Sequence, residues 1–352
     1  MEKKNKLTEL LNIDYPIIQA GMAGGVTSPE LIAAVSNSGA LGTLGAGYMS
    51  AEAMKDSILQ AKKLTDRPFG VNVFIPEFPE IVEEEVNEAN DLLEPFREQL
   101  KFEENVVPSV PDSQFDKQLE VAVEQQVAVC SFTFGVPSKE VVHDLKRRGI
   151  KVIGTATTVE EAVVNEEHGV DAVVAQGSEA GGHRGTFIHS FETSLIGTMS
   201  LVPQVVDQVH IPVIAAGGIM DGRGAAASLV LGAGGVQLGT AFVTSTESSA
   251  HQLHKEAILR AEESQTVLTR AFSGKPARGI QNAFIEKMKD YESNLPDYPV
   301  QNRLTKGIRK QAAKQNNPDF MSLWSGQSPR LSQRKAAGEI IKEIMEEVEK
   351  VL

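Results

Sequence analysis

One segment of the chain places a histidine among glycines, where a reactive side chain would have room. Residues 175–186 read AQGSEAGGHRGT and include Gln176, Gly181 and His183. Such glycines leave space for a flat ring or a small substrate. An imidazole titrates near neutral pH, so it can take up a proton or, once charged, hold an anion. His183 is therefore the candidate catalytic residue, although a loop histidine is more often simply solvated.

Two further glycine-rich turns could hold a phosphate. Residues 215–224 read AAGGIMDGRG, and residues 235–242 read GVQLGTAF. Consecutive glycines let the backbone approach a phosphate closely and direct N–H groups at it. Either turn alone would be read as a tight turn. Together, after consecutive strands, they predict a phosphate site.

The elements that would position these residues are short apolar runs alternating with amphipathic stretches. The runs are continuous rather than alternating, as expected of parallel strands buried on both faces. We expect strands at residues 15–20, 40–44, 69–75, 127–132, 151–154, 172–175, 212–216 and 235–238. Helical segments lie between them, and several of these begin near Ser, Thr or Asp and end at Gly.

Eight strand–helix units predict an α/β fold, a (β/α)8 TIM barrel, whose functional groups lie at the carboxyl ends of the strands. The three glycine-rich turns follow the sixth, seventh and eighth strands, and TIM barrels commonly bind phosphate after the last two. A doubly wound sheet is the alternative. Its dinucleotide motif is absent, because GTLGAG at residues 42–47 lacks the spacing and the following acidic residue.

Two segments do not follow the repeat. Residues 76–120 are acidic and predict an insertion after the third strand that passes over the top of the barrel. We expect the barrel within residues 1–270 and a C-terminal helical extension at residues 271–352, which caps the mouth and then docks on the outside. Its last helix carries Ile340, Ile344 and Val348 four apart. This apolar stripe would serve a homodimer contact equally well.

Composition narrows the class of protein. The net charge of −13 argues against a nucleic-acid partner and an anionic membrane surface. No segment is apolar over the length that a membrane span needs, and the N-terminus does not resemble a signal peptide. Cys130 is the only cysteine, so a reducing compartment, the cytoplasm, is predicted. We expect a small buried thiol there rather than a nucleophile.

Several other polar residues have simple interpretations. His251 and His254 have a spacing compatible with a metal, but without a third ligand nearby we expect two exposed polar residues and no metal site. Glu179 is expected in solvent, with orientation of His183 or Arg184 as the alternative. Asp221 is expected to cap the following helix. Trp324 and Gln327 would reach a cofactor or merely anchor the tail.

Five motifs of this chain resemble, in the same order, those of the nitronate monooxygenase family, formerly called 2-nitropropane dioxygenases: PIIQAGMAGG, GVNVF, AQGSEAGGHRG, PVIAAGGIMDGRG and VQLGTAF. The resemblance covers the barrel from Pro16 to about Ser245. The segment WSGQSPR near the C-terminus resembles the bacterial branch.

The resemblance implies an FMN enzyme and assigns roles to individual residues. His183 matches the active-site histidine, and the backbone of Ala20–Met22 would line the flavin ring. The remaining cofactor contacts implied are Asn72 and Gln176 at the ring or ribityl chain, the backbone of Gly181, and Gly218, Gln237, Leu238, Gly239 and Thr240 at the phosphate.

The implied reaction oxidises alkyl nitronates with O2 to carbonyl compounds and nitrite, a detoxification of nitroalkanes or propionate-3-nitronate. His183 would remove the α-proton of a neutral nitroalkane, or sit protonated beside the nitronate. On the same fold, the alternatives are a flavin-dependent enoyl-acyl carrier protein reductase and an NAD(P)H:quinone reductase. A barrel that binds a phosphorylated sugar or nucleotide without flavin, like IMP dehydrogenase, is a further alternative, but its loop cysteine is not apparent.

Overall fold

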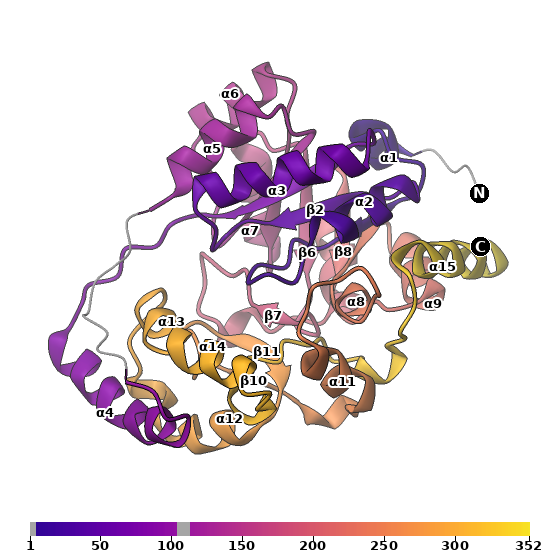
Figure 1. Cartoon of the computed structure of the whole chain (residues 1–352). Helices are drawn as coiled ribbons and strands as arrows, with labels where there is room; N and C mark the ends of the chain where they lie inside the picture. Colours follow the sequence, from indigo (N-terminus) through magenta and orange to yellow (C-terminus); the bar gives the residue numbers. More distant parts are fainter. Residues whose placement is uncertain (1–4, 104–112) are drawn as a thin grey trace.

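The eight expected strands form one parallel sheet that curves into a barrel (Figure 1). The computed structural model describes residues 5–103 and 113–352. The strands run through β1 (Ile17–Gln19), β2 (Gly42–Gly45), β3 (Phe69–Phe74), β4 (Val129–Thr133), β5 (Lys151–Ala156), β6 (Ala172–Gln176), β8 (Val213–Ala216) and β9 (Gly235–Leu238). They lie in the order β1-β9-β8-β6-β5-β4-β3-β2, and nearly all their residues are buried. The predicted TIM barrel is confirmed.

A side chain helps to close the barrel between β1 and β2. The backbone ladder is short there, with a bridge between Ile18 and Leu41. The fully buried Gln19 extends it: its Oε1 accepts a hydrogen bond from the Thr43 amide at 3.0 Å, and its Nε2 donates to the Thr43 carbonyl at 3.3 Å. The side-chain amide thus replaces a peptide group of the ladder.

Helices cover the outside of the sheet, as the alternating pattern predicted. They are α2 (Pro29–Asn37), α3 (Ala51–Leu64), α5 (Phe115–Glu124), α6 (Lys139–Arg147), α7 (Val159–Glu167), α8 (Thr198–Val206) and α9 (Gly222–Val230). The N-terminal helix α1 (Lys6–Leu11) instead packs Leu7 and Leu11 into a separate core cluster, against strand residues such as Ile18 and Ile214. Side chains of Ser28, Ser50, Ser138, Thr158 and Asp221 cap five of these helices at their N-termini. The expected cap at Asp221 is therefore confirmed.

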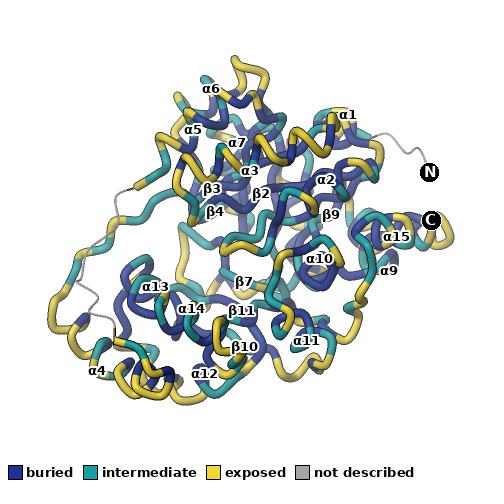
Figure 2. The backbone as a smooth tube through the Cα atoms, viewed as in Figure 1, coloured by how far each residue is buried: buried dark blue, intermediate teal, exposed yellow. Residues whose placement is uncertain are grey.

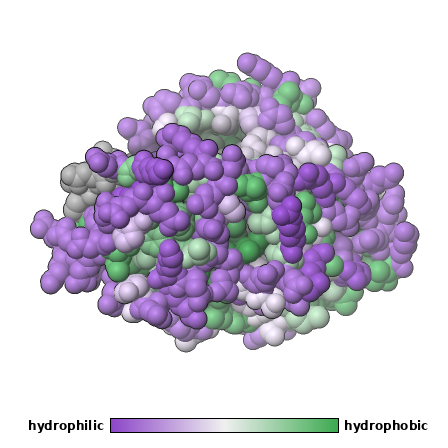
Figure 3. Space-filling view, turned by 60° about the horizontal axis from the view of Figure 1, so that its bottom comes forward, coloured by the Kyte–Doolittle hydropathy of each residue, from purple (hydrophilic) through white to green (hydrophobic). Residues whose placement is uncertain are grey.

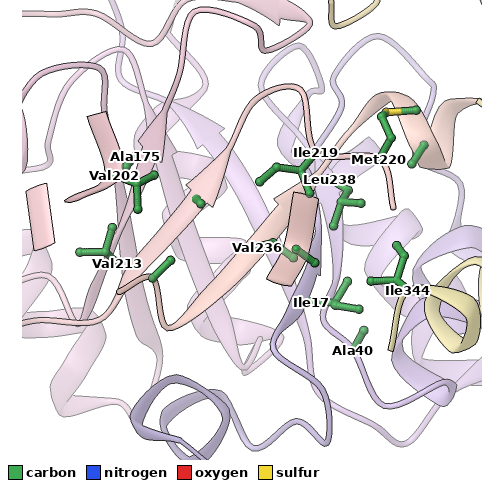
Figure 4. Close-up of a cluster of buried hydrophobic side chains, with 14 of the residues drawn as sticks. Ile17, Ala40, Ala175, Val202, Val213, Ile219, Met220, Val236, Leu238 and Ile344 are labelled. Carbon is green, nitrogen blue, oxygen red and sulfur yellow. The ribbon is translucent and has the colours of Figure 1, made fainter. Parts of the chain in front are cut away.

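The last helix, α15 (Ala337–Val351), packs between α9 and α2. This is the place of the helix that follows the eighth strand of a TIM barrel. Its buried residues Ile340, Ile344 and Val348 belong to the core cluster of the barrel, and Figure 4 shows Ile344 among side chains from several strands. The C-terminal helical extension thus ends by completing the helical layer.

A cap covers the carboxyl ends of the strands. It includes α4 (Glu83–Gln99) from the insertion after β3, and α10 (Thr240–Val243), α11 (Gln252–Arg260), α12 (Ala283–Met288), α13 (Val300–Leu304) and α14 (Lys306–Lys314). Short 3-10 helices lie at Glu192–Ser194, Glu263–Gln265, Lys289–Asn294, Pro318–Phe320 and Pro329–Leu331. Apolar side chains of α4 and α12–α14 share a second core, whose buried segments are dark in Figure 2. The face turned forward in Figure 3 is mostly hydrophilic, with hydrophobic residues gathered towards its middle.

A small antiparallel sheet joins the cap to the barrel. Its strands lie in the order β10 (Thr266–Thr269), β11 (Ala277–Ile280) and β7 (Gly182–His183). The register pairs His183 with Ala277. The expected histidine loop is therefore partly a strand, held from outside the barrel. Among the described residues, no helix combines the length and apolar character that crossing a bilayer requires.

Candidate active site

A cavity at the carboxyl ends of the barrel strands collects most of the predicted site residues. It has a volume of about 200 Å³. It is lined by Asn72, Gln176, Gly181, His183, Gly218, Gln237, Gly239 and Thr240, and also by Ala20, Gly21 and Met22. Leu238 is the exception, because its side chain belongs to the barrel core and only its carbonyl, which accepts from the Ala20 amide, faces the β1 end.

The loop that carries His183 is fixed by Gln176 and Arg184. The Gln176 Nε2 donates to the His183 carbonyl at 3.1 Å, and its Oε1 accepts from the Gly185 amide at 2.8 Å. The guanidinium of Arg184, which is fully buried, donates to the Gly177 and Ser194 carbonyls at 2.6 and 3.0 Å. Burial lowers the pKa of Arg184 to about 10. Gln176, expected at the flavin, therefore also holds the histidine loop to the end of β6.

His183 lies among aromatic rings from three distant segments. Its ring centroid is 5.8 Å from that of Phe134, 6.1 Å from that of Tyr298 and 5.5 Å from that of Trp324. Burial lowers the pKa of His183 to about 3, and the charges of Lys275 and Arg309 act in the same direction. The side chain keeps partial exposure, and it borders the cavity. The imidazole is therefore neutral at physiological pH.

One hydrogen bond fixes the imidazole. Its Nε2 lies 2.8 Å from the Oγ of Ser273, in the loop between β10 and β11. Nδ1 has no hydrogen-bond partner among the residues that the structure describes. A neutral imidazole with one unengaged nitrogen in a cavity can act as a proton acceptor.

The glycine-rich turns after β8 and β9 leave backbone donors without partners. In the described chain, the amide N–H groups of Gly218 and Thr240 donate no hydrogen bond. Gly218 has φ of 71°, which favours glycine. The Oγ1 of Thr240 accepts from the Gly326 amide at 2.8 Å, so the C-terminal segment closes over this turn. Two free donors within one cavity form a cradle suited to a phosphate.

The opposite wall of the cavity is polar. The Nδ2 of Asn72, on β3, donates to Ser131 Oγ and Thr133 Oγ1 at 3.0 and 3.2 Å, and all three residues line the cavity. A Cβ at Gly21 would lie 2.5 Å from the Cβ of Asn72, so the chain after β1 approaches this wall closely. Both Nδ2 hydrogens are engaged, which leaves the Oδ1 of Asn72 to accept from a ligand.

The structure also shows the surroundings of Glu179, Cys130 and Gln327, whose roles were predicted from the sequence. Glu179, expected in solvent, is half-buried, and its carboxylate accepts from the amide and Oγ1 of Thr198 at the start of α8 rather than from His183. Cys130 is fully buried, and burial raises the pKa of its thiol to about 12, which confirms an apolar role. Gln327 is exposed and holds the tail through its amide, which donates to the Glu179 carbonyl at 2.9 Å.

The prediction that His251 and His254 are two exposed polar residues is wrong, because His254 is buried and His251 is half-buried. His251 caps α11 by accepting from the Leu253 amide at 3.2 Å. His254 is buried, lines the cavity, and donates through Nε2 to the Trp324 carbonyl at 2.9 Å. Burial lowers the pKa of His254 to about 4. Trp324, whose carbonyl accepts this hydrogen bond, also borders the cavity, and its indole lies against His183. Of the two roles predicted for Trp324, this position agrees with contact with a cofactor.

A second, larger cavity of about 690 Å³ lies beside the first. Tyr298 and Lys275 line it, and the Lys275 Nζ lies 2.6 Å from Glu77 and 4.8 Å from the Phe134 ring centroid. His183 and the glycine-rich turns border the smaller cavity, so that one holds the chemistry. Tyr298 lines the outer cavity, and its ring centroid lies 6.1 Å from that of His183.

Sequence reasoning missed Phe134, Tyr298, Ser273 and Lys275. None belongs to a local motif that predicts chemistry. Phe134 has a positive φ of 73°, a feature of the folded backbone that its sequence does not reveal. The others come from the cap, and their position depends on how the small sheet pairs with β7.

Comparison with known proteins places this geometry in a family. The sequence model of nitronate monooxygenases matches residues 4–347. The chain belongs to the nitronate monooxygenase family. It is therefore an oxidoreductase, and its site can be compared with those of relatives.

Nitronate monooxygenase relatives cover the whole chain. A probable nitronate monooxygenase of Staphylococcus aureus strain Newman is 52% identical over 353 residues, which are 100% of this chain and 99% of the relative. One of Staphylococcus saprophyticus is 52% identical over 354 residues, with the same coverage.

Two solved structures extend the comparison. The nitroalkane oxidase of Streptomyces ansochromogenes is 42% identical, with a TM-score of 0.91 and 98% of each chain covered. FabK of Thermotoga maritima is 33% identical, with a TM-score of 0.78 and coverage of 99% of this chain and 97% of that one. This member of the nitronate monooxygenase family thus shares more structure and sequence with the nitroalkane oxidase.

Proposed function

We propose that the protein is an FMN-dependent enzyme that oxidises alkyl nitronates with O2 to carbonyl compounds and nitrite. The observation that carries the proposal is that the imidazole of His183 borders the same cavity as two glycine-rich turns with free amides. Burial lowers the pKa of this imidazole, which favours its neutral form. Membership of the nitronate monooxygenase family supports the reaction.

The residues of the cavity fit a flavin mononucleotide. The free amides of Gly218 and Thr240 suit its phosphate, and the Oδ1 of Asn72 can accept from a ring or ribityl donor. A Cβ at Gly181 would lie 2.5 Å from the Gly326 amide, so the cavity wall is bare backbone that a flat ring can approach. One phosphate cradle and no adenosine motif favour FMN over FAD. When bound, the flavin supplies the capacity to accept electrons from the substrate and pass them to O2.

The protein itself would position the substrate and move one proton. His183, held neutral, can accept the α-proton of a neutral nitroalkane, which converts the substrate into its nitronate. Lys275 and Arg309 lower the pKa of His183 through their positive charge, which favours the neutral form of the ring that can accept a proton. Phe134, Tyr298 and Trp324 surround the ring with apolar surface and limit water near it.

An enoyl-acyl carrier protein reductase remains the second candidate, since the FabK structure shares the fold. The outer cavity weighs against it. Its charged residues are the cations Arg270 and Lys275 and the carboxylates of Glu77, Glu192, Glu292 and Asp297. Both cations already pair with carboxylates, at 2.7 Å for Arg270 with Asp297 and 2.6 Å for Lys275 with Glu77. Such a surface attracts the phosphates of NAD(P)H or of an acyl carrier poorly.

Anaerobic flavin reduction separates the candidates. The purified flavoprotein is mixed without oxygen with ethyl nitronate, nitroethane or NADH, and the visible absorbance of the flavin is followed. We expect ethyl nitronate to bleach the flavin rapidly, NADH to act slowly, and readmission of O2 to yield nitrite. Rapid bleaching by NADH without any response to nitronate would contradict the proposal.

The cellular setting follows from the proposed reaction and the composition. Detoxification of nitroalkanes or propionate-3-nitronate agrees with a small cavity, and the single, buried Cys130 agrees with a cytoplasmic location.

A further inference from the structure

We propose that Ser273 is a positioning residue that fixes the proton of the neutral His183 on Nε2 and so leaves the Nδ1 lone pair as the base. This inference rests on the proposed function for its chemical consequence, but the tautomer itself follows from hydrogen-bond geometry. No local motif predicts it, because the serine lies 90 residues from the histidine in the chain.

The hydrogen bonds of Ser273 determine which atom donates. Its hydroxyl carries one proton and lies 3.0 Å from the Lys275 carbonyl, which can only accept. The hydroxyl proton is therefore used, and Ser273 Oγ faces the His183 Nε2 at 2.8 Å with lone pairs only. Nε2 must then carry the hydrogen, as in a histidine whose second nitrogen is oriented by a neighbouring acceptor. A neutral ring has one hydrogen, so Nδ1 is unprotonated.

The loop that carries Ser273 is held rigidly enough to impose this orientation. Gln301 Nε2 donates to the Ala271 carbonyl at 2.8 Å, and Thr305 Oγ1 donates to the Phe272 carbonyl. The Phe272 ring stacks on Phe284 with centroids 4.5 Å apart. Ser273 itself is only 1% exposed. The serine therefore belongs to the packed core of the cap and not to a free surface turn.

The proton transfer balances without another reactant. The α-carbon–hydrogen bond of a nitroalkane breaks, the proton forms a bond with His183 Nδ1, and the electron pair spreads into the nitro group. The product is a nitronate beside an imidazolium, whose Nε2–H still donates to Ser273. A nitronate supplied from outside has already lost this proton, so its oxidation does not need the lone pair.

The first test reads the tautomer directly in the flavin-loaded enzyme. Protein labelled with 15N in histidine is studied by long-range 1H–15N correlation, and the His183 signals are assigned by their loss in His183→Gln. We expect the ring proton on Nε2 in the wild type and in Ser273→Thr, which keeps the hydroxyl. In Ser273→Ala, the ring should no longer show this single tautomer. A wild-type ring protonated on Nδ1 would overturn the inference, whatever the enzyme oxidises.

The second test compares two substrates that differ by the proton. In Ser273→Ala, anaerobic flavin reduction by nitroethane should slow about ten- to hundredfold relative to reduction by ethyl nitronate, as for other groups that orient a functional histidine. Ser273→Thr should restore the ratio. Ser36→Ala, which removes another buried serine hydroxyl, one that donates to the Pro68 carbonyl at 3.0 Å, serves as the matched control.

Each outcome decides a separate question. An equal loss with both substrates, or the same change of ratio in Ser36→Ala, would reduce Ser273 to a structural residue and overturn the inference. If the wild type reacts with neither substrate, the proposed function fails, and the tautomer spectrum still decides the role of Ser273.

Discussion

At the scale of single residues, the position of His183 could be predicted from the sequence but its chemical state could not. Glycines beside a histidine after the sixth strand indicate a site. The pKa of that histidine depends on Phe134, Tyr298 and Lys275, which come from two other parts of the chain. The choice between base and cationic anchor, open from the sequence, therefore depends on tertiary packing. The lowered pKa of His183 agrees with the proposed role as a base.

The pH dependence of activity tests this neutral state. Because the pKa of His183 lies at about 3, the base stays unprotonated as the pH falls, and kcat/KM for nitroethane should not drop through the ordinary histidine range. We expect a level acid side between about pH 8 and pH 5, measured against ethyl nitronate as the proton-independent control. An acid inflection near 6.5, seen with nitroethane alone, would show that burial does not depress this pKa.

At the scale of elements, the sequence predicted the regular parts well. Continuous apolar runs identified all eight barrel strands because strands buried on both faces need few polar residues. The small sheet of β7, β10 and β11 was not predicted, since β7 has only two residues and its partners lie in the cap. The apolar stripe of α15 predicted a buried helix face, but only the fold shows that it packs between α9 and α2.

Substitutions in the glycine-rich turns separate fold from ligand binding. Gly239 has room for a methyl group, with the nearest atom, the Ala20 Cβ, at 3.8 Å, whereas a Cβ at Gly181 meets the Gly326 amide at 2.5 Å. We expect Gly239→Ala to keep its thermal stability and bind FMN more weakly, and Gly181→Ala to lose both. FMN titration by fluorescence and thermal unfolding measure the two effects. Gly224→Ala, in α9, is the control, and unchanged FMN affinity in Gly239→Ala would argue against a phosphate at this turn.

The docking of α15 has a matched pair of positions for a stability test. Ile344 is 2% exposed in the barrel core, and Val351 in the same helix is 60% exposed. Ile344→Ala should lower the free energy of unfolding by about 2–5 kcal/mol, because it removes methyl groups and leaves a cavity. Val351→Ala should change it by less than about 0.5 kcal/mol. Equal effects in urea denaturation would mean that α15 does not contribute to the cooperative core.

At the scale of the whole molecule, the chain leaves the barrel twice and both excursions meet over the strand ends. Residues after β3 supply α4, and residues after β9 supply the cap before α15 returns to the barrel wall. Apolar side chains from both excursions share one core. The rings around His183 come from the loop after β4 and from the cap. Contacts between segments so far apart leave no periodic signal in the sequence, which explains why these residues were missed.

The burial of His254, the second histidine at the cavity, predicts how the free energy of unfolding depends on pH. His254 is 6% exposed, and burial lowers its pKa from the usual 6.5 to about 4. Between these two values the unfolded chain binds a proton at this position and the folded protein does not. The contribution of the neutral His254 to the free energy of unfolding is therefore complete above pH 6.5 and is lost as the pH falls towards 4. One such histidine changes the free energy of unfolding by at most about 1.4 kcal/mol per pH unit.

Urea unfolding of the flavin-free protein at several pH values between about 7 and 5 measures this dependence. His254→Gln keeps a side-chain donor for the Trp324 carbonyl but cannot titrate, so its unfolding free energy should fall less steeply than that of the wild type as the pH decreases. His210→Gln, at a side chain that is 95% exposed, is the control and should follow the wild type. Parallel curves for wild type and His254→Gln would show that the cap opens to solvent around His254. In that case the cap would not seal the end of the cavity that His254 borders.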